Sequence, residues 1–330
     1  MRKNLFGISA ALLFSGLTSQ AMSQTSLKFS YELPVTHPFH VGSEKLRDCV
    51  AQKTNNMVKI ELYPAGQIAK DSTFIKSITS GTLDGGLSPT LYWTGVMPNA
   101  GIFDVPFVIT SHEEANKILN GPIGERLLKE LDSKDLVGLG FFNYGFGIFG
   151  NNKKQLKTPS DFAGLKIRTN NDIGAKLLVA YGASPVFMSG SEVFIALERG
   201  TVDGSHLGLS SIVERKIYQT VKNLTVDNHN AIPYFVVFSK EAFRKLQDDQ
   251  KVALKACVTE VANWVSKEQE KGDSEAIGFL RKQGMDVIEL TPEQIKVWQA
   301  AAKPAKDYWL ERAGPDGQKL LSEMEAALKK

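Results

Sequence analysis

The chain has 330 residues, of which 42% are hydrophobic and 23% are charged. This length and composition are ordinary for a soluble globular protein with one large or two medium domains, and they exclude a disordered or low-complexity chain. The formal net charge is only +3 and no basic stripe is visible, so the sequence predicts no nucleic-acid partner.

The first 23 residues have the three-part pattern of a secretory signal. Arg2 and Lys3 precede an uncharged apolar run over residues 5–17, and small residues surround Ala21 and Ser23. The run is too short to cross a bilayer comfortably as a permanent helix, although a retained N-terminal anchor is the alternative. We therefore predict that residues 1–23 are a signal peptide and that a nearly neutral mature protein is exported to the periplasm.

Along the mature chain, strand patterns alternate with helix patterns. Apolar runs predict strands over 27–33, 58–63, 83–87, 136–149, 165–168, 202–207 and 232–239. Amphipathic runs predict helices over 41–53, 71–79, 175–181 and 192–199, with Asp71 and Ser191 as N-caps and with Asn55, Gly81, Gly182 and Gly200 as stops. Beyond Lys240 the pattern is helical, and we expect breaks near Gly272, Gly284, Pro292 and Gly314.

This alternation predicts an α/β architecture with mostly parallel strands. A polar seam at residues 150–159 divides the strands into two blocks, and the chain can cross back near residues 233–239. We therefore expect a two-lobed fold with strand hinges, long C-terminal helices and a ligand cleft between the lobes. The expected boundaries are 24–149 plus about 236–272 for lobe I, and 150–235 plus about 273–330 for lobe II.

Cys49 and Cys257 each lie on an apolar helical stripe. They can be two buried small hydrophobic residues. In an oxidising compartment they can instead form a disulfide. The sequence does not give the separation that decides between these alternatives.

The usual catalytic signatures are absent from the sequence, which contains no P-loop, no Gly-x-Ser-x-Gly elbow and no His-Glu-x-x-His. His37 and His40 are close neighbours, but no third metal ligand lies near them. We therefore predict no enzyme activity, no metal and no cofactor.

An ordered set of motifs carries the strongest functional signal. It centres on Gly164-Leu165-Lys166-Ile167-Arg168 and Val202-Asp203-Gly204. The other members are His37-Pro38, Tyr63-Pro64-Ala65-Gly66-Gln67, Gly81-Thr82-Leu83-Asp84, Val105-Pro106-Phe107, Thr158-Pro159-Ser160-Asp161-Phe162, Gly182-Ala183-Ser184-Pro185-Val186 and Ser191-Glu192-Val193-Phe194. Together they resemble the solute-binding proteins of tripartite ATP-independent periplasmic (TRAP) transporters, the DctP family.

The resemblance implies a two-lobed protein that closes on an organic anion and delivers it to a membrane permease. It also implies that Arg168, at the end of its strand, binds the ligand carboxylate. A planar guanidinium suits this role because it donates two parallel hydrogen bonds and stays charged when buried. Asn171 matches a position that often offers an amide to the ligand, although it can equally cap the helix that follows.

Departures from the family pattern bear on the ligand. Many relatives carry a second arginine where this chain has Gly147, and polar residues where it has His206 and Leu207. Tyr92 and Trp93 stand where acidic-sugar binders carry polar or basic side chains, although both can instead be core or rim residues. We therefore expect a roomier, less charged and more aromatic pocket. An unpaired second carboxylate in a closed cleft costs about 2–5 kcal/mol, so a hydroxy, keto or aromatic monocarboxylate is favoured over a dicarboxylate.

The expected site thus comprises Arg168, Asn171, Tyr92, Trp93, Gly147, Leu207, His206 and His37. The expected partners are a small carboxylate and the permease subunits, and the protein is expected to be a monomer. A dicarboxylate or sugar-acid binder, or a sensor that passes its closed state to a receptor, are the alternatives.

Overall fold

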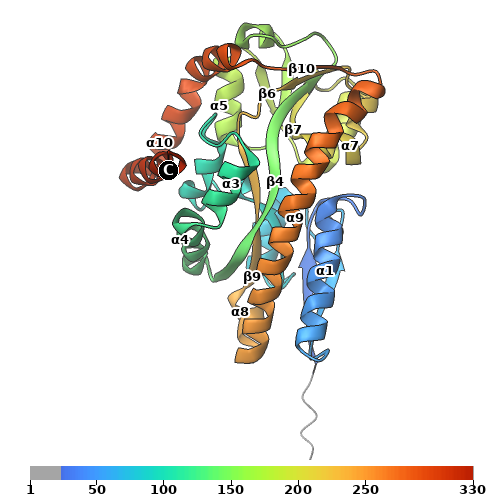
Figure 1. The fold of residues 1–330 in the computed structure, drawn as a ribbon, viewed down its shortest axis with the longest axis vertical. Helices are drawn as coiled ribbons and strands as arrows, with labels where there is room; N and C mark the ends of the chain where they lie inside the picture. The colour runs from blue at the N-terminus through green and yellow to red at the C-terminus, as the bar shows by residue number, and fades with distance from the viewer. Residues whose placement is uncertain (1–23, 330) are drawn as a thin grey trace, which may run out of the picture.

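A computed structural model of the chain describes residues 24–329, so the predicted signal peptide lies outside the described residues (Figure 1). The first half of the sheet contains β1 (Thr25–Ser30), β2 (Val58–Tyr63), β3 (Gly85–Pro89) and β9 (Ala231–Ser239), in the order β2-β1-β3-β9. β1 is parallel to β2 and β3, whereas β9 is antiparallel to β3. We call this group, with the part of β4 that pairs with β9, the first half-sheet.

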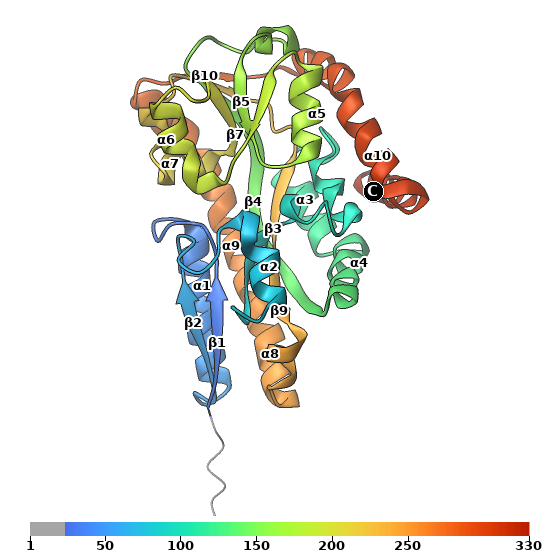
Figure 2. The ribbon, with the colours of Figure 1, turned by 180° about the vertical axis from the view of Figure 1, so that it is seen from behind.

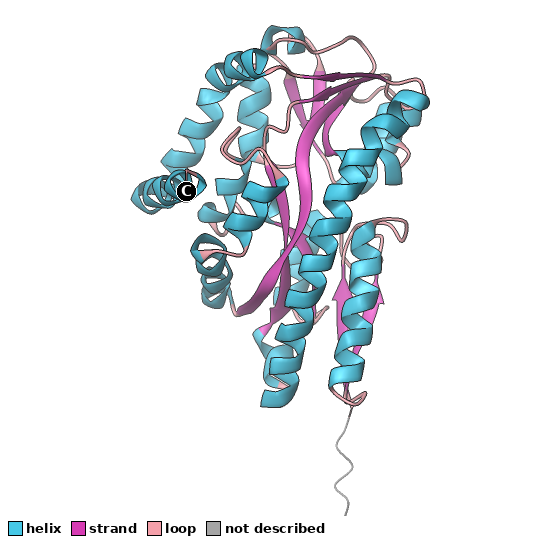
Figure 3. Ribbon diagram, in the orientation of Figure 1, coloured by secondary structure: helices cyan, strands magenta, loops and turns pink. Residues whose placement is uncertain are grey.

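β4 (Leu136–Asn151) continues the sheet and links its two halves (Figure 3). Its early residues pair with β9, and Gly147 to Asn151 pair with β7 (Gly204–Gly208). The second half-sheet is completed by β5 (Lys166–Thr169), β6 (Ser184–Phe187), β8 (Asn223–Val226) and β10 (Asp286–Glu289). The predicted α/β architecture is therefore confirmed. The exact lobe boundaries stay a prediction.

Short helices cover both half-sheets (Figure 2). In chain order they are α1 (Pro38–Lys53), α2 (Phe74–Thr79), α3 (His112–Leu119), α4 (Pro122–Glu130), α5 (Asp172–Ala180), α6 (Val193–Glu198), α7 (Leu209–Glu214) and α8 (Lys240–Arg244). Short 3-10 turns at 71–73, 90–92, 98–104, 131–134, 159–162, 190–192 and 217–219 lie between them. None of the helices in residues 24–329 is both long and apolar enough to cross a membrane.

Two long helices close the chain. α9 (Asp248–Lys282) runs past both half-sheets and contacts α1, α7, β4 and β10 (Figure 1). α10 (Pro292–Leu328) packs on α5 and on the 3-10 turn at 98–104. The break expected at Gly272 is wrong, because α9 continues through it: a glycine costs a helix only about 1 kcal/mol. The break at Gly314 is confirmed by its non-helical backbone (φ 63°, ψ −155°).

The structure resolves the alternatives for the two cysteines. Cys49 on α1 and Cys257 on α9 form a disulfide, with their Cα atoms 5.8 Å apart. The two helices pack against each other. Cys257 belongs to the hydrophobic cluster between them and the first half-sheet, and Cys49 lies at its edge. The apolar stripes of α1 and α9 therefore both pack into this cluster, and the disulfide connects the two helices.

Candidate functional site

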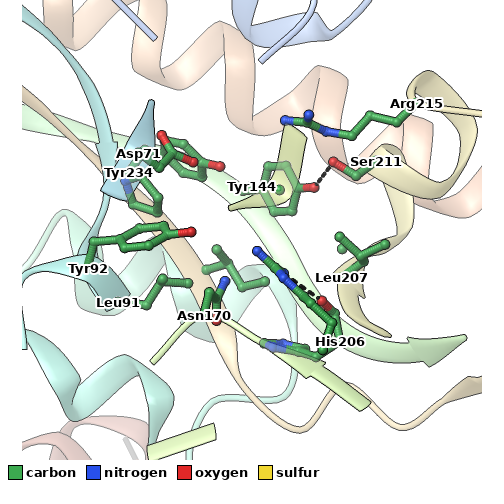
Figure 4. A pocket seen from close by; sticks show the side chains of 15 residues that line it. Asp71, Leu91, Tyr92, Tyr144, Asn170, His206, Leu207, Ser211, Arg215 and Tyr234 are labelled. Carbon is green, nitrogen blue, oxygen red and sulfur yellow. Dashed lines mark hydrogen bonds between the residues drawn. The ribbon is translucent and has the colours of Figure 1, made fainter. Parts of the chain in front are cut away.

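A cavity that is partly open to solvent lies between the two half-sheets, with about 410 Å³ free of protein atoms when the solvent-exposed part is included. Figure 4 shows Asp71 and Tyr92 on one side of it, facing His206, Leu207 and Arg215 on the other. The first half-sheet and its connections supply Asp71, Pro89, Leu91, Tyr92, Tyr144, Ile232 and Tyr234, and the second supplies Arg168, Asn170, Gly190, His206, Leu207, Gly208, Ser211 and Arg215. The predicted cleft is therefore present, and both halves of the sheet contribute its walls.

Arg168 lies on β5 and is 2% exposed. Its Nε donates to the carbonyl oxygen of Met188 (3.0 Å), and one terminal nitrogen donates to the carbonyl oxygen of His206 (3.0 Å). These two bonds fix the plane of the guanidinium, and its other terminal nitrogen has no hydrogen-bond partner among the described residues. Within residues 24–329 no carboxylate forms a salt bridge with it. Because a buried charge without a counterion is costly, this geometry fits an arginine that receives an anionic ligand.

Arg215 is a second arginine in the cavity, and sequence reasoning missed it. It directly follows α7, and one terminal nitrogen donates to the main-chain oxygen of Glu32 (3.5 Å) across the cleft. Its Nε is buried and has no hydrogen-bond partner among the described residues. In the sequence it is one charge in a Glu-Arg-Lys run, so no local signal distinguishes it from a solvent-exposed residue.

Asp71 is a buried acid on the opposite wall. It is 6% exposed, and its Oδ1 has no hydrogen-bond partner in the described chain. Its main-chain N–H donates to one oxygen of the Glu32 carboxylate (2.6 Å), whose other oxygen accepts from the N–H of Ser191 (2.6 Å). Burial and the nearby charge of Glu32 raise the pKa of Asp71 well above its usual range, although Arg215 and Arg168 oppose this effect.

The cavity is lined by aromatic rings and by polar atoms without hydrogen-bond partners. Besides Asp71 and Arg215, the hydroxyl of Tyr92 and the side-chain oxygen of Asn170 are buried and have no partner within residues 24–329. The Tyr144 hydroxyl, by contrast, donates to Ser211 (Figure 4). Buried polar groups in native proteins are nearly always paired. We therefore expect a ligand with several oxygen atoms to complete these bonds.

The structure brings four of the predicted residues into the cavity wall and places the other four elsewhere. Arg168, Tyr92, His206 and Leu207 line the cavity. Trp93 does not, because its ring is fully buried against Phe235 and its indole N–H donates to Ser88 (2.9 Å). The alternative interpretation of Trp93 as a core residue is therefore the correct one.

Asn171 and His37 are helix caps. The Asn171 side-chain oxygen accepts from the N–H of Gly174 (2.7 Å) at the start of α5, and its neighbour Asn170 lines the cavity instead. The His37 ring accepts from the N–H of Phe39 (3.1 Å) at the start of α1 and stacks on Tyr144 at 5.4 Å. His37 thus supports a cavity residue from behind, and burial keeps it neutral by lowering its pKa to about 3.

The expectation of extra room beside Gly147 is wrong. A Cβ atom at this position would lie 2.1 Å from the side-chain oxygen of Asn230 and 2.1 Å from Nε2 of His206. These two side chains are themselves joined at 3.1 Å and occupy the space. Gly147 therefore makes room for His206, not for the ligand.

A buried polar network lies behind His206. Asn230 also donates to Asp104 (2.9 Å), and His229, beside the His206 ring, is paired with Asp227 (2.9 Å). Burial lowers the pKa of His206 well below its usual range and that of His229 to about 3, so both rings are neutral near pH 7. In the described part of the chain, no group of three or more His, Cys, Asp or Glu side chains is arranged to hold a metal ion.

Asp104 makes stability depend on pH. Burial raises its pKa to about 7, although the bond from Asn230 opposes this. The folded chain therefore keeps a proton that the unfolded chain loses near pH 4, so stability falls as pH rises from about 4 to about 7. Asp104→Asn imitates the protonated acid and removes this dependence. Its free energy of unfolding relative to wild type is expected to increase by about 3 kcal/mol between about pH 5 and about pH 8.

Urea unfolding at both pH values measures this difference. The control is Asp132→Asn, which removes the same charge from a side chain that is 59% exposed. An equal stability difference at the two pH values for Asp104→Asn would show that Asp104 titrates normally.

Comparison with known proteins agrees with this geometry. The sequence model of the DctP family, described as bacterial extracellular solute-binding protein, family 7, matches residues 29–312. The C4-dicarboxylate-binding periplasmic protein DctP of Rhodobacter capsulatus is 30% identical over 317 residues, which cover 94% of each chain.

Two solved structures have closely similar folds. The sugar acid binding protein DctPAm from Advenella mimigardefordensis, in complex with galactonate, aligns with a TM-score of 0.88 and 26% identity, covering 92% of this chain and 99% of that one. A TRAP periplasmic solute binding protein from Sulfurospirillum deleyianum with bound succinate aligns with a TM-score of 0.86 and 25% identity over the same shares. The predicted family and its two-lobed fold are confirmed.

Proposed function

We propose that this chain, which belongs to family 7 of the bacterial extracellular solute-binding proteins, captures an organic monocarboxylate in the periplasm and delivers it to the permease of a TRAP transporter. Members of this family are substrate-binding proteins of transporters and not enzymes. The observation that supports this function most directly is the buried, carboxylate-free guanidinium of Arg168 in the wall of the cleft. A carboxylate in line with its free terminal nitrogen would neutralise it.

The charges around the cleft support a monocarboxylate. Arg168 and Arg215 contribute two positive charges, and Glu32 supplies one negative charge next to Asp71. One ligand carboxylate brings this group to neutrality when Asp71 carries a proton. The unpaired atoms of Tyr92, Asn170 and Arg215 fit hydroxyl or keto oxygens on the same ligand. A hydroxy or keto acid therefore satisfies both the charge and the hydrogen bonds.

Arg215 is also the observation that favours the alternative of a dicarboxylate. Its Nε has no hydrogen-bond partner among the described residues and provides a second cationic donor, which the sequence did not reveal where Gly147 replaces the arginine of many relatives. In that case the second carboxylate would lie between Arg215 and Asp71. A dicarboxylate carries one more negative charge than a monocarboxylate, so these two classes are separable by experiment, whereas a sugar acid such as galactonate is itself a hydroxy monocarboxylate.

A thermal-shift and calorimetric screen of the mature protein tests the proposal. The panel contains lactate, pyruvate, mandelate, galactonate, malate and succinate, with the matching amides as uncharged controls. Ligand at a hundred times its Kd stabilises the folded state by about 2.7 kcal/mol, and we expect this from hydroxy or keto monocarboxylates. Stronger stabilisation by succinate or malate would favour the dicarboxylate reading. Conversion of the acid during incubation would contradict a pure binding function.

A further inference from the structure

We propose that Asp71 is a specificity-determining residue that carries a proton when the cleft is closed around a ligand. The site would then take up one monoanionic acid together with one proton and disfavour dianions. This inference rests on the proposed function, because it concerns the same cleft.

The first support is the lack of any donor to the Asp71 carboxyl group. Its Oδ1 is buried without a partner, and among residues 24–329 no side chain or main-chain N–H donates to either of its oxygens. A buried carboxylate needs such donors to stay ionised. Around Glu32 the opposite holds, because each of its oxygens accepts a main-chain N–H at 2.6 Å. Of these two neighbouring acids, only Glu32 has the hydrogen-bond donors that a buried carboxylate needs.

The second support is that Glu32 joins the two walls of the cleft. Asp71 belongs to the wall beside the first half-sheet, and Ser191 precedes α6 beside the second half-sheet. Around this link, Lys70 pairs with Glu192 (3.3 Å) and Ser189 donates to Ser72 (3.0 Å). The arrangement is therefore the closed one, in which Asp71 is cut off from solvent. Opening the cleft would hydrate Asp71, so closure is the step that draws in a proton.

The third support is the set of charges that face Asp71. Among the described residues, the charges that act on Asp71 are those of the cations Arg168 and Arg215 and of the anion Glu32. With Asp71 neutral these three sum to a single positive charge, which one ligand carboxylate cancels. With Asp71 ionised, a monoanion leaves one negative charge in a buried site, and a dianion leaves two. The other titratable groups on this wall or behind it stay uncharged, because burial raises the pKa of Tyr92, Tyr144 and Tyr234 and lowers that of His37 and His206.

In the protonated state the Asp71 O–H becomes a donor in a cleft that has unpaired acceptors. The proton comes from solvent and is bound by a carboxyl oxygen of Asp71. It stays on that oxygen, and the resulting O–H donates a hydrogen bond to a hydroxyl or keto oxygen of the ligand. This explains why an acid stands opposite two arginines in an anion-binding site: it supplies a donor without adding a third positive charge.

Calorimetric titration of the full mature protein with galactonate, lactate and succinate tests this proposal. Each ligand is titrated from about pH 5.5 to about pH 8.5 in two buffers of different ionisation enthalpy, which reports the protons taken up. For wild type we expect proton uptake on binding of either monoanion. We also expect a loss of affinity that approaches tenfold per pH unit at the alkaline end. Asp71→Asn, which cannot ionise but keeps a donor, is expected to bind without proton uptake and with a flat pH profile.

Asp132→Asn is the matched control, because it removes the same charge from a side chain that is 59% exposed. It should keep the pH dependence of wild type. The proposal is overturned if wild type binds a monoanion without proton uptake, or if Asp71→Asn loses binding while remaining folded. Loss of binding by a folded Asp71→Asn would make Asp71 an ionised acceptor for a ligand hydroxyl, and the absence of proton uptake would show that binding is not coupled to protonation. Both results leave the transport function intact. If none of the acids binds to wild type, the proposed function fails as well. Should Asp71→Asn not fold, proton uptake by wild type alone decides the matter.

Discussion

Replacing Arg168 with alanine is expected to weaken carboxylate binding strongly while the ligand-free protein stays folded. Removing one partner of a buried, hydrogen-bonded charge pair costs about 2–5 kcal/mol of affinity, which raises Kd roughly 30-fold to several thousand-fold. The effect on folding should be smaller. In the ligand-free protein the guanidinium has no carboxylate partner and makes only two bonds, to the carbonyl oxygens of Met188 and His206. Water entering the cleft can replace both bonds.

Calorimetric Kd values and urea unfolding of the ligand-free protein separate these two effects. Arg168→Lys keeps the charge but lacks the planar fork that bonds two carbonyls and a carboxylate at once, so we expect it to recover only part of the affinity. Arg199→Ala changes an exposed arginine after α6 and should behave like wild type. If Arg168→Ala bound the same acids with unchanged affinity, the anchor would lie elsewhere, and Arg215 would be the next residue to test.

The sequence predicted those elements whose pattern is local. The strand at residues 58–63 has the bounds of β2 because its apolar residues alternate up to a Pro-Ala-Gly turn. β10 was missed, because Asp286–Glu289 becomes a strand only by pairing with Asn223–Val226, far away in the chain. The predicted N-cap Ser191 is wrong, because this residue lies inside the 3-10 turn at 190–192 that precedes α6. Ser189 caps that turn and forms a capping box with Glu192.

For the candidate site, too, the sequence predicted residues in local motifs but missed residues that only long-range contacts bring together. Arg168 was identifiable because it lies near the end of a strand in a family motif. Tyr92, His206 and Leu207 were identified from the same resemblance to the family. Arg215 and Asp71 have no such pattern. Folding brings them together in the cleft, where each donates a hydrogen bond to Glu32, which lies 39 residues before Asp71 and 183 residues before Arg215. The error at Gly147 has the same origin, because only the pairing of β4 with β7 brings His206 into the space beside it.

Removing the disulfide between Cys49 and Cys257 is expected to lower the free energy of unfolding by about 2–5 kcal/mol and to leave ligand affinity unchanged. The bond closes a loop with a sequence separation of 208 residues, so it restricts the unfolded chain strongly. It links α1 to α9 beside the first half-sheet, and neither cysteine lines the cavity. The variant Cys49→Ser with Cys257→Ala suits the site, because Cys257 is fully buried and Cys49 only partly. Urea unfolding and calorimetry with the best acid of the panel measure the two quantities.

Wild type with and without reductant is the control, and alkylation of the denatured protein confirms which form is present. Equal free energies of unfolding for the oxidised and reduced forms would show that the disulfide does not stabilise the protein. A loss of affinity as large as the loss of stability would have a different meaning. α9 contacts α7 as well as α1, and α7 carries Ser211 and is followed by Arg215. The disulfide would then hold α9 in the position that sets one wall of the cleft, and its role would be to align the two halves of the binding site in addition to stabilising the fold.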